Sequence, residues 1–311
     1  MKNRSRWLKH PIDSAISSLA KVGGNRKSVI MDKDSPFNHV LKVYQETRRP
    51  RGSYLSTEYL DALNIRVFEM DLETGKPEDP GLQFGTPCPS QEVDKLFEEV
   101  SDDFGGLDQG DLYCTGYGIT TTIKNSFHEM GLFGFGDKPK SIGAYYAREK
   151  NSSSTVENRL GFHSSSRDKE PDFHTRLIFG AYDKRIPHRG CILLDGAVSD
   201  ERFLRRSEVY CAALLIGDKL RWAKKPHERH FPVFIYSISE SQGRIIQAHY
   251  EHPHFIVRKT KHFLFEEGSA SGYKMMVRWM LNNPTGDMGT PRKSTKDRVL
   301  NLVKALKPSV H

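Results

Sequence analysis

The clearest hydrophobic pattern in the chain lies within residues 199–282. From about Asp200 to Trp222, apolar side chains recur at the three- and four-residue spacing of one helical face, and others widen that face: Val209, Ala213, Ile216 and Leu220, with Phe203, Tyr210 and Leu214. This spacing predicts a long, largely buried helix. Ser199 and Asp200 are the candidate caps at its start, because a short side-chain oxygen can accept from free N–H groups of the first turn. Pro226 follows its end.

Three strand patterns and a second helix follow that helix. Phe231–Ser239, Arg244–Tyr250 and Phe255–Phe265 are rich in β-branched and aromatic residues and are joined by short polar turns, which predicts an antiparallel meander. Between residues 244 and 250 successive side chains point to opposite faces of the strand, so we expect one face to be exposed to solvent and the other to be buried. Apolar residues at helical spacing between Tyr273 and Leu281 predict a closing helix on one face of the meander.

The rest of the chain carries shorter patterns. They predict helices near 37–44, 89–100 and 119–132, and strands at 65–70, 141–147, 175–182 and 190–198. We therefore predict an α+β fold, an antiparallel or mixed sheet with helices packed on it and an irregular N-terminal half. The predicted segments are a basic arm and short helix over 1–60, an acidic segment over 61–150, an α+β core unit over 168–284 and a basic helix over 285–311.

Composition narrows the class of protein. With 311 residues, of which 37% are hydrophobic and 28% charged, the chain can bury a core of globular type. It has no run of about 18 apolar residues of the kind that spans a membrane, and no apolar segment near its basic N-terminus that would predict a secretory signal. We expect an intracellular protein, cytoplasmic or nuclear. Its four scattered cysteines include no Cys-x-x-Cys pair, which favours reduced thiols.

Charge is distributed unevenly around the net value of +8. Residues 1–60 carry 12 basic and 5 acidic groups, residues 61–115 carry 3 and 14, and the remainder carries 32 and 20. This asymmetry has two interpretations: the basic ends neutralise nucleic-acid phosphates, or the segments attract one another and keep the protein in solution. The candidate binding residues are Arg48, Arg49, Arg51, Arg205, Arg206, Arg258, Lys259 and Lys261.

Two further residue types raise the question of catalysis. Histidines gather at 227–230 and 249–254, and imidazoles suit a transition metal; the alternative is that they occupy an exposed hairpin turn at 250–254. Which cofactor the protein uses, if any, is unknown from the sequence. A serine hydrolase would need a nucleophile on a sharp turn, yet the chain has no Gly-x-Ser-x-Gly motif, and nothing in the sequence selects one serine from the many.

The order of predicted elements over 190–282 is a strand, a long helix, a pair of strands and a closing helix. This order resembles the C-terminal half of the PD-(D/E)xK nuclease-like domains of filamentous fungi. The resemblance covers less than a third of the chain. It implies that Asp183 and Asp195 stand near the two acidic positions that hold a divalent cation. Ala197 stands where that family has its lysine, and Lys184 is the nearest cation in sequence. Without the lysine, hydrolysis would lack a group to orient water or stabilise charge.

Three functional hypotheses follow. The first is a non-catalytic intracellular macromolecule-binding protein, with nucleic acid or a protein as partner. The second is a divergent or degenerate metal-dependent nuclease-like enzyme, and the third is a scaffold or interaction protein. Arginines beside exposed aromatic residues would favour the first, convergence of Asp183, Asp195 and Glu208 would favour the second, and a large exposed apolar patch would favour the third.

Overall fold

The fold comes from a computed structural model, which describes residues 35–48, 52–101, 119, 123, 146–148, 173–181, 186–223, 230–266 and 269–285. Eight strands within these residues form one mixed sheet in the order β1-β8-β7-β6-β5-β4-β3, with β9 paired to β7. The strands are β1 (Ile65–Glu69), β3 (Tyr146–Arg148), β4 (Phe173–Ala181), β5 (Arg189–Asp195), β6 (Val233–Ser239), β7 (Gln242–Glu251), β8 (His254–Lys259) and β9 (Phe263–Leu264). A small second sheet pairs β2 (Gly85–Thr86) with β10 (Asn283–Pro284).

The centre of the sheet is a parallel pair joined by a helix. β5 lies parallel to β6, and α8 (Arg206–Trp222) connects them. The predicted meander is confirmed, because β6, β7 and β8 pair antiparallel in sequence order. The predicted third strand is shorter than expected: β8 ends at Lys259, and only two residues further on, in β9, return to pair with β7. At the far edge β1 lies parallel to β8.

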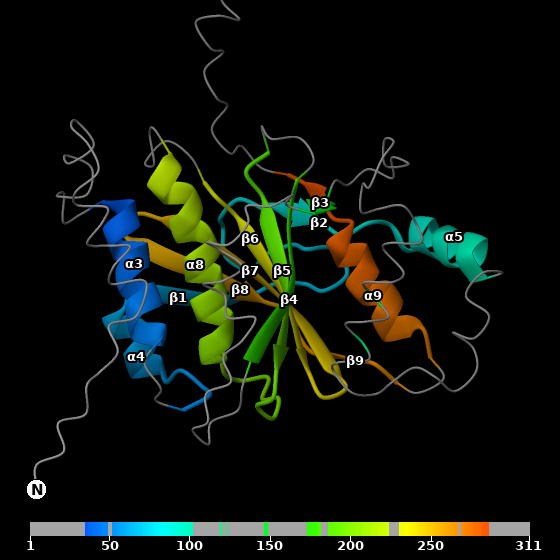
Figure 1. The fold of residues 1–311 in the computed structure, drawn as a ribbon, viewed down its shortest axis with the longest axis horizontal. Helices are drawn as coiled ribbons and strands as arrows, with labels where there is room; N and C mark the ends of the chain where they lie inside the picture. Colours follow the sequence, from blue (N-terminus) through cyan, green and yellow to red (C-terminus); the bar gives the residue numbers. More distant parts are fainter. Residues whose placement is uncertain are drawn as a thin grey trace, which may run out of the picture.

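Helices cover both faces of the sheet (Figure 1). On one face α8 packs with α3 (Pro36–Thr47) and α4 (Thr57–Ala62), and their apolar residues share one core cluster with β5, β6 and β7. On the other face α9 (Ser271–Met280) and α5 (Ser90–Ser101) belong to a second cluster. The α+β prediction is therefore confirmed. Among the described residues, no helix is long and apolar enough to cross a membrane.

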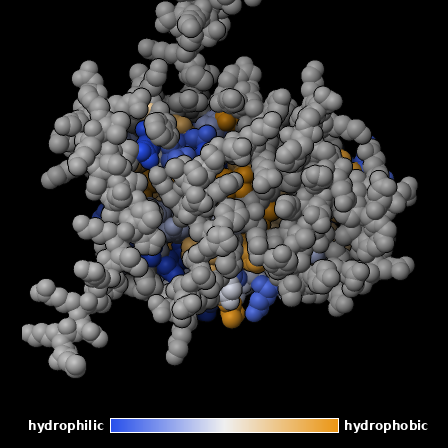
Figure 2. All heavy atoms as spheres, in the orientation of Figure 1, coloured by the Kyte–Doolittle hydropathy of each residue, from blue (hydrophilic) through white to orange (hydrophobic). Residues whose placement is uncertain are grey.

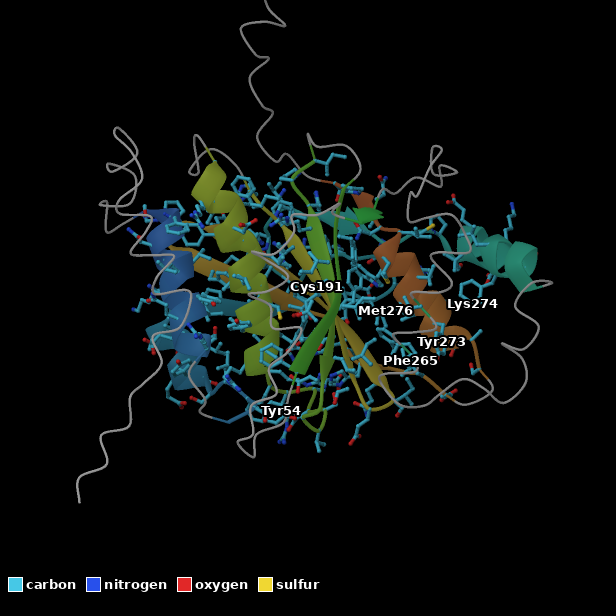
Figure 3. The ribbon with its side chains drawn as sticks, in the orientation of Figure 1. Tyr54, Cys191, Phe265, Tyr273, Lys274 and Met276 are labelled. Atoms are coloured by element: carbon cyan, nitrogen blue, oxygen red, sulfur yellow. The ribbon has the colours of Figure 1, made fainter. Side chains whose placement is uncertain are left out.

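The prediction that one face of the 244–250 strand is exposed to solvent is wrong. Every residue from Gly243 to Tyr250 is buried, because α8 covers one face of β7 and α9 covers the other. Figure 3 shows the α9 side, where Tyr273 and Met276 lie beside Phe265, and Cys191 lies at the centre of the sheet. The closing helix does lie on the meander, as predicted. Polar side chains on β7 are consequently enclosed and need partners inside the protein.

The predicted start of the long helix is also wrong. α8 begins at Arg206 rather than near Asp200, and Arg205 is its N-cap. Two hydrogen bonds explain the later start. Oε2 of Glu208 accepts from the backbone N–H of Arg205 at 2.9 Å, which caps the helix there. Oδ1 of Asp200 accepts from the backbone N–H of Arg202 at 3.0 Å, which holds residues 200–202 in a turn. Residues 196–205 therefore form a loop at the end of the sheet. The helix ends at Trp222, as predicted.

The described parts of the predicted segments do not stand apart in space. α3, from 1–60, packs against α8, and β1, from 61–150, pairs with β8 of the core unit. Within 119–132 the structure describes Ile119 and Ile123, both helical and buried, and residues 286–311 lie outside the described part. Cys88, Cys191 and Cys211 are free and buried, as expected for reduced thiols, while Cys114 is not among the described residues.

Candidate functional site

A group of polar side chains lies where β5 and β6 end and α8 begins. We call it the edge cluster: Asp195, Ser199, Arg205, Ser207, Glu208, Arg244 and His262. In sheets with parallel strands, the crevice at the carboxyl ends of the strands is the usual place for a ligand, since the helix N-terminus and the loops meet there. The cluster combines residues from β5, the 196–205 loop, α8, β7 and the 260–262 loop.

Glu208 and Arg244 form the buried centre of the edge cluster. Nε of Arg244 donates to Oε1 of Glu208 at 2.7 Å, and Nη2 donates to Oε2, with the two side chains 1% and 0% exposed. Nη2 also donates to the carbonyl oxygen of Phe203 at 3.0 Å. Burial alone would raise the pKa of Glu208, but the charge and hydrogen bonds of Arg244 outweigh burial and hold it below its usual value. This ion pair fixes the 196–205 loop to α8.

Arg205 is buried beside this pair with a different set of partners. Its Nη1 donates to Oγ of Ser237 at 3.2 Å, and its Nη2 donates to Oγ of Ser199 at 2.7 Å. Its Nε is buried without a hydrogen-bond partner among the described residues. The guanidinium thus donates to two hydroxyl groups rather than to a carboxylate, an arrangement that solvates a buried cation only weakly.

Asp195, the candidate metal ligand, lies at the end of β5 and is buried. Its Oδ1 accepts from the backbone N–H of Ala197 at 2.8 Å, and its Oδ2 accepts from the hydroxyl of Ser207. Burial raises the pKa of Asp195, although those two hydrogen bonds oppose the rise. Both carboxylates of the edge cluster are therefore occupied by donors of the protein.

Convergence of Asp183, Asp195 and Glu208, which would favour the nuclease hypothesis, can be followed for two of the three residues. Asp195 and Glu208 lie near enough for the charge of Glu208 to act on Asp195, whereas Asp183, like Lys184, lies outside the described residues. No group of three or more His, Cys, Asp or Glu side chains in the described part of the chain is placed to hold a metal ion.

The outer surface of the edge cluster carries an aromatic and basic platform. The guanidinium of Arg202 lies 5.3 Å from the ring centroid of Phe203, and the rings of Phe203 and Tyr54 are 6.1 Å apart. The hydroxyl of Tyr54 donates to the carbonyl oxygen of Val198, whose side chain is 69% exposed. Figure 3 places Tyr54 at the lower edge of the molecule, where Figure 2 shows hydrophobic and hydrophilic side chains next to one another.

The candidate binding residues do not form one basic face. Arg205, Arg258 and Lys259 are buried, and Arg206 is partly buried and donates to the carbonyl oxygens of Gly52 and Thr47. Lys261 is exposed and Arg48 is partly exposed, whereas Arg49 and Arg51 lie outside the described residues. Arg202, predicted in the first turn of a helix, is an exposed loop residue.

The fold brings His230 and His249 together, with ring centroids 5.8 Å apart, but places His252 elsewhere. His252 is exposed in the hairpin turn, as one interpretation expected, but His249 is buried on β7 with its ring centroid 4.7 Å from that of Phe84. His230 lies near the same Phe84 ring, with 5.5 Å between centroids. His188, which sequence reasoning missed, donates from Nε2 to the carbonyl oxygen of Phe84 at 2.6 Å. The rings of His230 and His249 thus pack against Phe84, while the His188 ring stacks on Phe234 at 6.0 Å between centroids.

We expect the buried histidines to make folding acid-sensitive. Burial lowers the pKa of His188 to about 4, against about 6.5 in the unfolded chain, so protons bind more strongly to the unfolded state. The stability from His188 is complete above pH 6.5 and is lost as the pH falls toward 4. At pH 5 this histidine alone should cost about 2 kcal/mol relative to pH 7.5, measured by urea unfolding.

The control for this effect is His188→Gln, whose amide N–H can still donate to Phe84 but does not titrate. Its stability should fall less between pH 7.5 and pH 5 than that of the unchanged protein. An equal fall in both proteins would mean that His188 is not the source of the acid sensitivity.

Comparison with models of protein families, with curated proteins and with solved structures finds no match for this chain. The function of the edge cluster is therefore inferred from the geometry of its residues alone. Its buried arginines could not be distinguished in the sequence from solvated ones, since Arg205 and Arg206 are neighbours with different environments.

Proposed function

We propose that the protein binds nucleic acid, with single strands preferred, through the platform of Tyr54, Arg202 and Phe203. The observation that carries the proposal is the exposed guanidinium of Arg202 over the ring of Phe203, with a second aromatic ring beside it. Bases stack on such rings whatever their sequence, and each stacked base contributes about 1–3 kcal/mol.

The fixed position of the Arg202 guanidinium supports this proposal. Arg202 is 79% exposed, and its Nε and Nη2 donate to the carboxylate of Asp200 at 3.2 and 2.9 Å. Hydrogen bonds from Arg202 lower the pKa of Asp200 to about 2, so the aspartate is charged at neutral pH and holds the guanidinium in place. Among the described residues Nη1 has no hydrogen-bond partner and can donate to a phosphate oxygen. The exposed Lys261 adds a second positive charge in the neighbouring 260–262 loop.

Binding is expected to depend on both the ring and the charge. Phe203→Ala should weaken binding of a labelled single-stranded DNA or RNA about tenfold, because one stacking surface is lost. Arg202→Ala should weaken it too, and should reduce the slope of log affinity against log salt concentration by about one. Fluorescence anisotropy at two salt concentrations measures both effects.

Arg66→Ala is the matched control, since Arg66 is an exposed arginine on β1 and lies outside the platform. It should leave affinity nearly unchanged. If Arg66→Ala weakens binding as much as Arg202→Ala, the binding is a general effect of net charge, and if no binding is seen at low salt the proposal is wrong.

The second candidate function, a divergent metal-dependent nuclease, draws on the placement of Asp195 beside Glu208 at the start of α8. It is the weaker candidate, because both carboxylates already accept hydrogen bonds from the protein. The binding experiment tests it when magnesium is added. Cleavage of the labelled nucleic acid that requires magnesium and disappears in Asp195→Asn would replace the binding proposal with the nuclease.

A further inference from the structure

We propose that Ser199 and His262 form a nucleophile and base pair that transfers acyl groups from esters with an apolar acyl chain. Oγ of Ser199 lies 3.0 Å from Nε2 of His262, although the two residues are 63 positions apart in the sequence. A hydroxyl within hydrogen-bond reach of an imidazole is the arrangement in which a serine is activated. The geometry therefore selects one serine, which the sequence could not.

The direction of the hydrogen bond follows from Arg205. A guanidinium can only donate, so the bond of 2.7 Å from Nη2 makes the oxygen of Ser199 an acceptor and leaves the hydroxyl proton for another partner. Nε2 of His262 takes that role when the ring proton is on Nδ1. Burial and the charges of Arg244 and Arg205 lower the pKa of His262 to about 4, so the ring is neutral at pH 7 and can accept.

Arg205 also favours negative charge on the serine oxygen. It is a buried cation that donates to hydroxyl groups only, and its Nε has no hydrogen-bond partner among the described residues. A charge on Oγ of Ser199 would give this guanidinium a hydrogen-bonded anion at 2.7 Å, in addition to the charges of Asp195 and Glu208 that already act on it through space. This attraction favours transfer of the serine proton to His262, which is a weak base. Glu201 connects the two sides of the site, because its Oε1 accepts from the backbone N–H of His262 at 3.1 Å.

The surroundings of the pair indicate the substrate class. Ser199 and His262 are half-buried and so remain in contact with solvent. Leu264, two residues after the histidine, is 48% exposed. In extended chain, residues two apart lie on the same side, which places Leu264 on the His262 side of its segment. This exposed apolar side chain on the side of the base favours an apolar acyl group.

The proposed ester hydrolysis has two steps, acylation of the serine and release of the acyl group. Oγ of Ser199 attacks the ester carbonyl carbon, its proton passes to Nε2 of His262, and the bond to the alcohol oxygen breaks as that oxygen takes the proton from the imidazolium. Water then attacks the acyl-serine, again through His262, and releases the carboxylic acid and free serine. The net reaction is ester plus water to acid plus alcohol, with no metal or redox partner.

A fluorophosphonate probe on the full chain tests the pair without knowledge of the natural substrate. Attack by Oγ on phosphorus forms the O–P bond and expels fluoride, which leaves a stable mass tag on the serine. We expect tagging of Ser199, found by peptide mass mapping, and about a 100-fold or greater loss of rate in His262→Gln, since a positioned base contributes on that scale. Ser199→Ala should remove the tag.

Ser269 provides the control, because its hydroxyl bonds to Ser271 rather than to an imidazole, and Ser269→Ala should tag as fast as the unchanged protein. Absence of a tag on Ser199 in the folded, unchanged protein would overturn the proposal, whatever the variants do. Tagging of Ser199 at the same rate in His262→Gln would overturn the role of the base. The test uses no nucleic acid, so its outcome is independent of the binding experiment.

Discussion

Replacing Glu208 with alanine is expected to lower the free energy of unfolding by about 3–5 kcal/mol, because the change leaves a buried arginine without its anion. Arg244 is enclosed with Glu208, and Nε and Nη2 would both lose their carboxylate acceptor. The backbone N–H of Arg205 would lose its acceptor as well, which weakens the cap of α8. Urea unfolding at pH 7 measures the loss.

Two comparisons separate this effect from the general cost of removing a carboxylate. Asp94→Ala removes the anion from a surface pair with Lys274, whose N–O distance is 2.8 Å, and should cost no more than about 1 kcal/mol. Glu208→Leu combined with Arg244→Met removes both charges and should recover much of the loss. If Glu208→Ala costs as little as Asp94→Ala, the pair is not the buried interaction described above.

Replacing Arg258 with alanine is expected to be similarly costly, at about 3–5 kcal/mol. Its side chain is 0% exposed, and Nε and Nη2 donate to the two carboxylate oxygens of Asp79 at 2.7 and 2.6 Å. Nη1 also donates to the carbonyl oxygen of Leu82 at 2.6 Å and to Oε1 of Gln247 at 3.1 Å. The side chain thereby fastens the 79–84 segment to β7 and β8, and its loss should appear in urea unfolding.

Lys261→Ala is the neighbouring control, since Lys261 is exposed three residues further on. Its effect on stability should stay within about 0.5 kcal/mol. The sequence had suggested that Arg258 and Lys261 belong to one binding surface. If Arg258→Ala instead leaves stability unchanged and weakens binding of nucleic acid, the surface role predicted from the sequence is correct and the buried role is wrong.

Much of the secondary structure was readable from local patterns. The meander of β6, β7 and β8, the strand β1, and the helices α3, α5 and α9 all follow from spacing and residue type within short windows. The start of α8 was not readable in this way. By residue type the candidate caps are Ser199 and Asp200, whereas the observed N-cap is Arg205. That position depends on Glu208, whose orientation is set by Arg244 from β7, 36 residues away in the chain.

The candidate site was less predictable than the fold. Asp195 was named as a site residue only through the family resemblance, and the sequence could not indicate that its oxygens already accept from Ala197 and Ser207. The platform was missed because Arg202 and Phe203 were assigned to a helix, and only a loop lets the guanidinium lie over the ring of its neighbour.

The sequence by itself determined the α+β class, the order of most elements and the presence of apolar faces, because periodicity and propensity act between near neighbours in the chain. Only the tertiary structure decided which charges are buried and what each one contacts. Arg258 meets Asp79 across 179 residues, and Ser199 meets His262 across 63. Burial and ion pairing depend on which segments the sheet brings together. The same residue type can therefore be a solvated surface charge at one position and an enclosed partner at another.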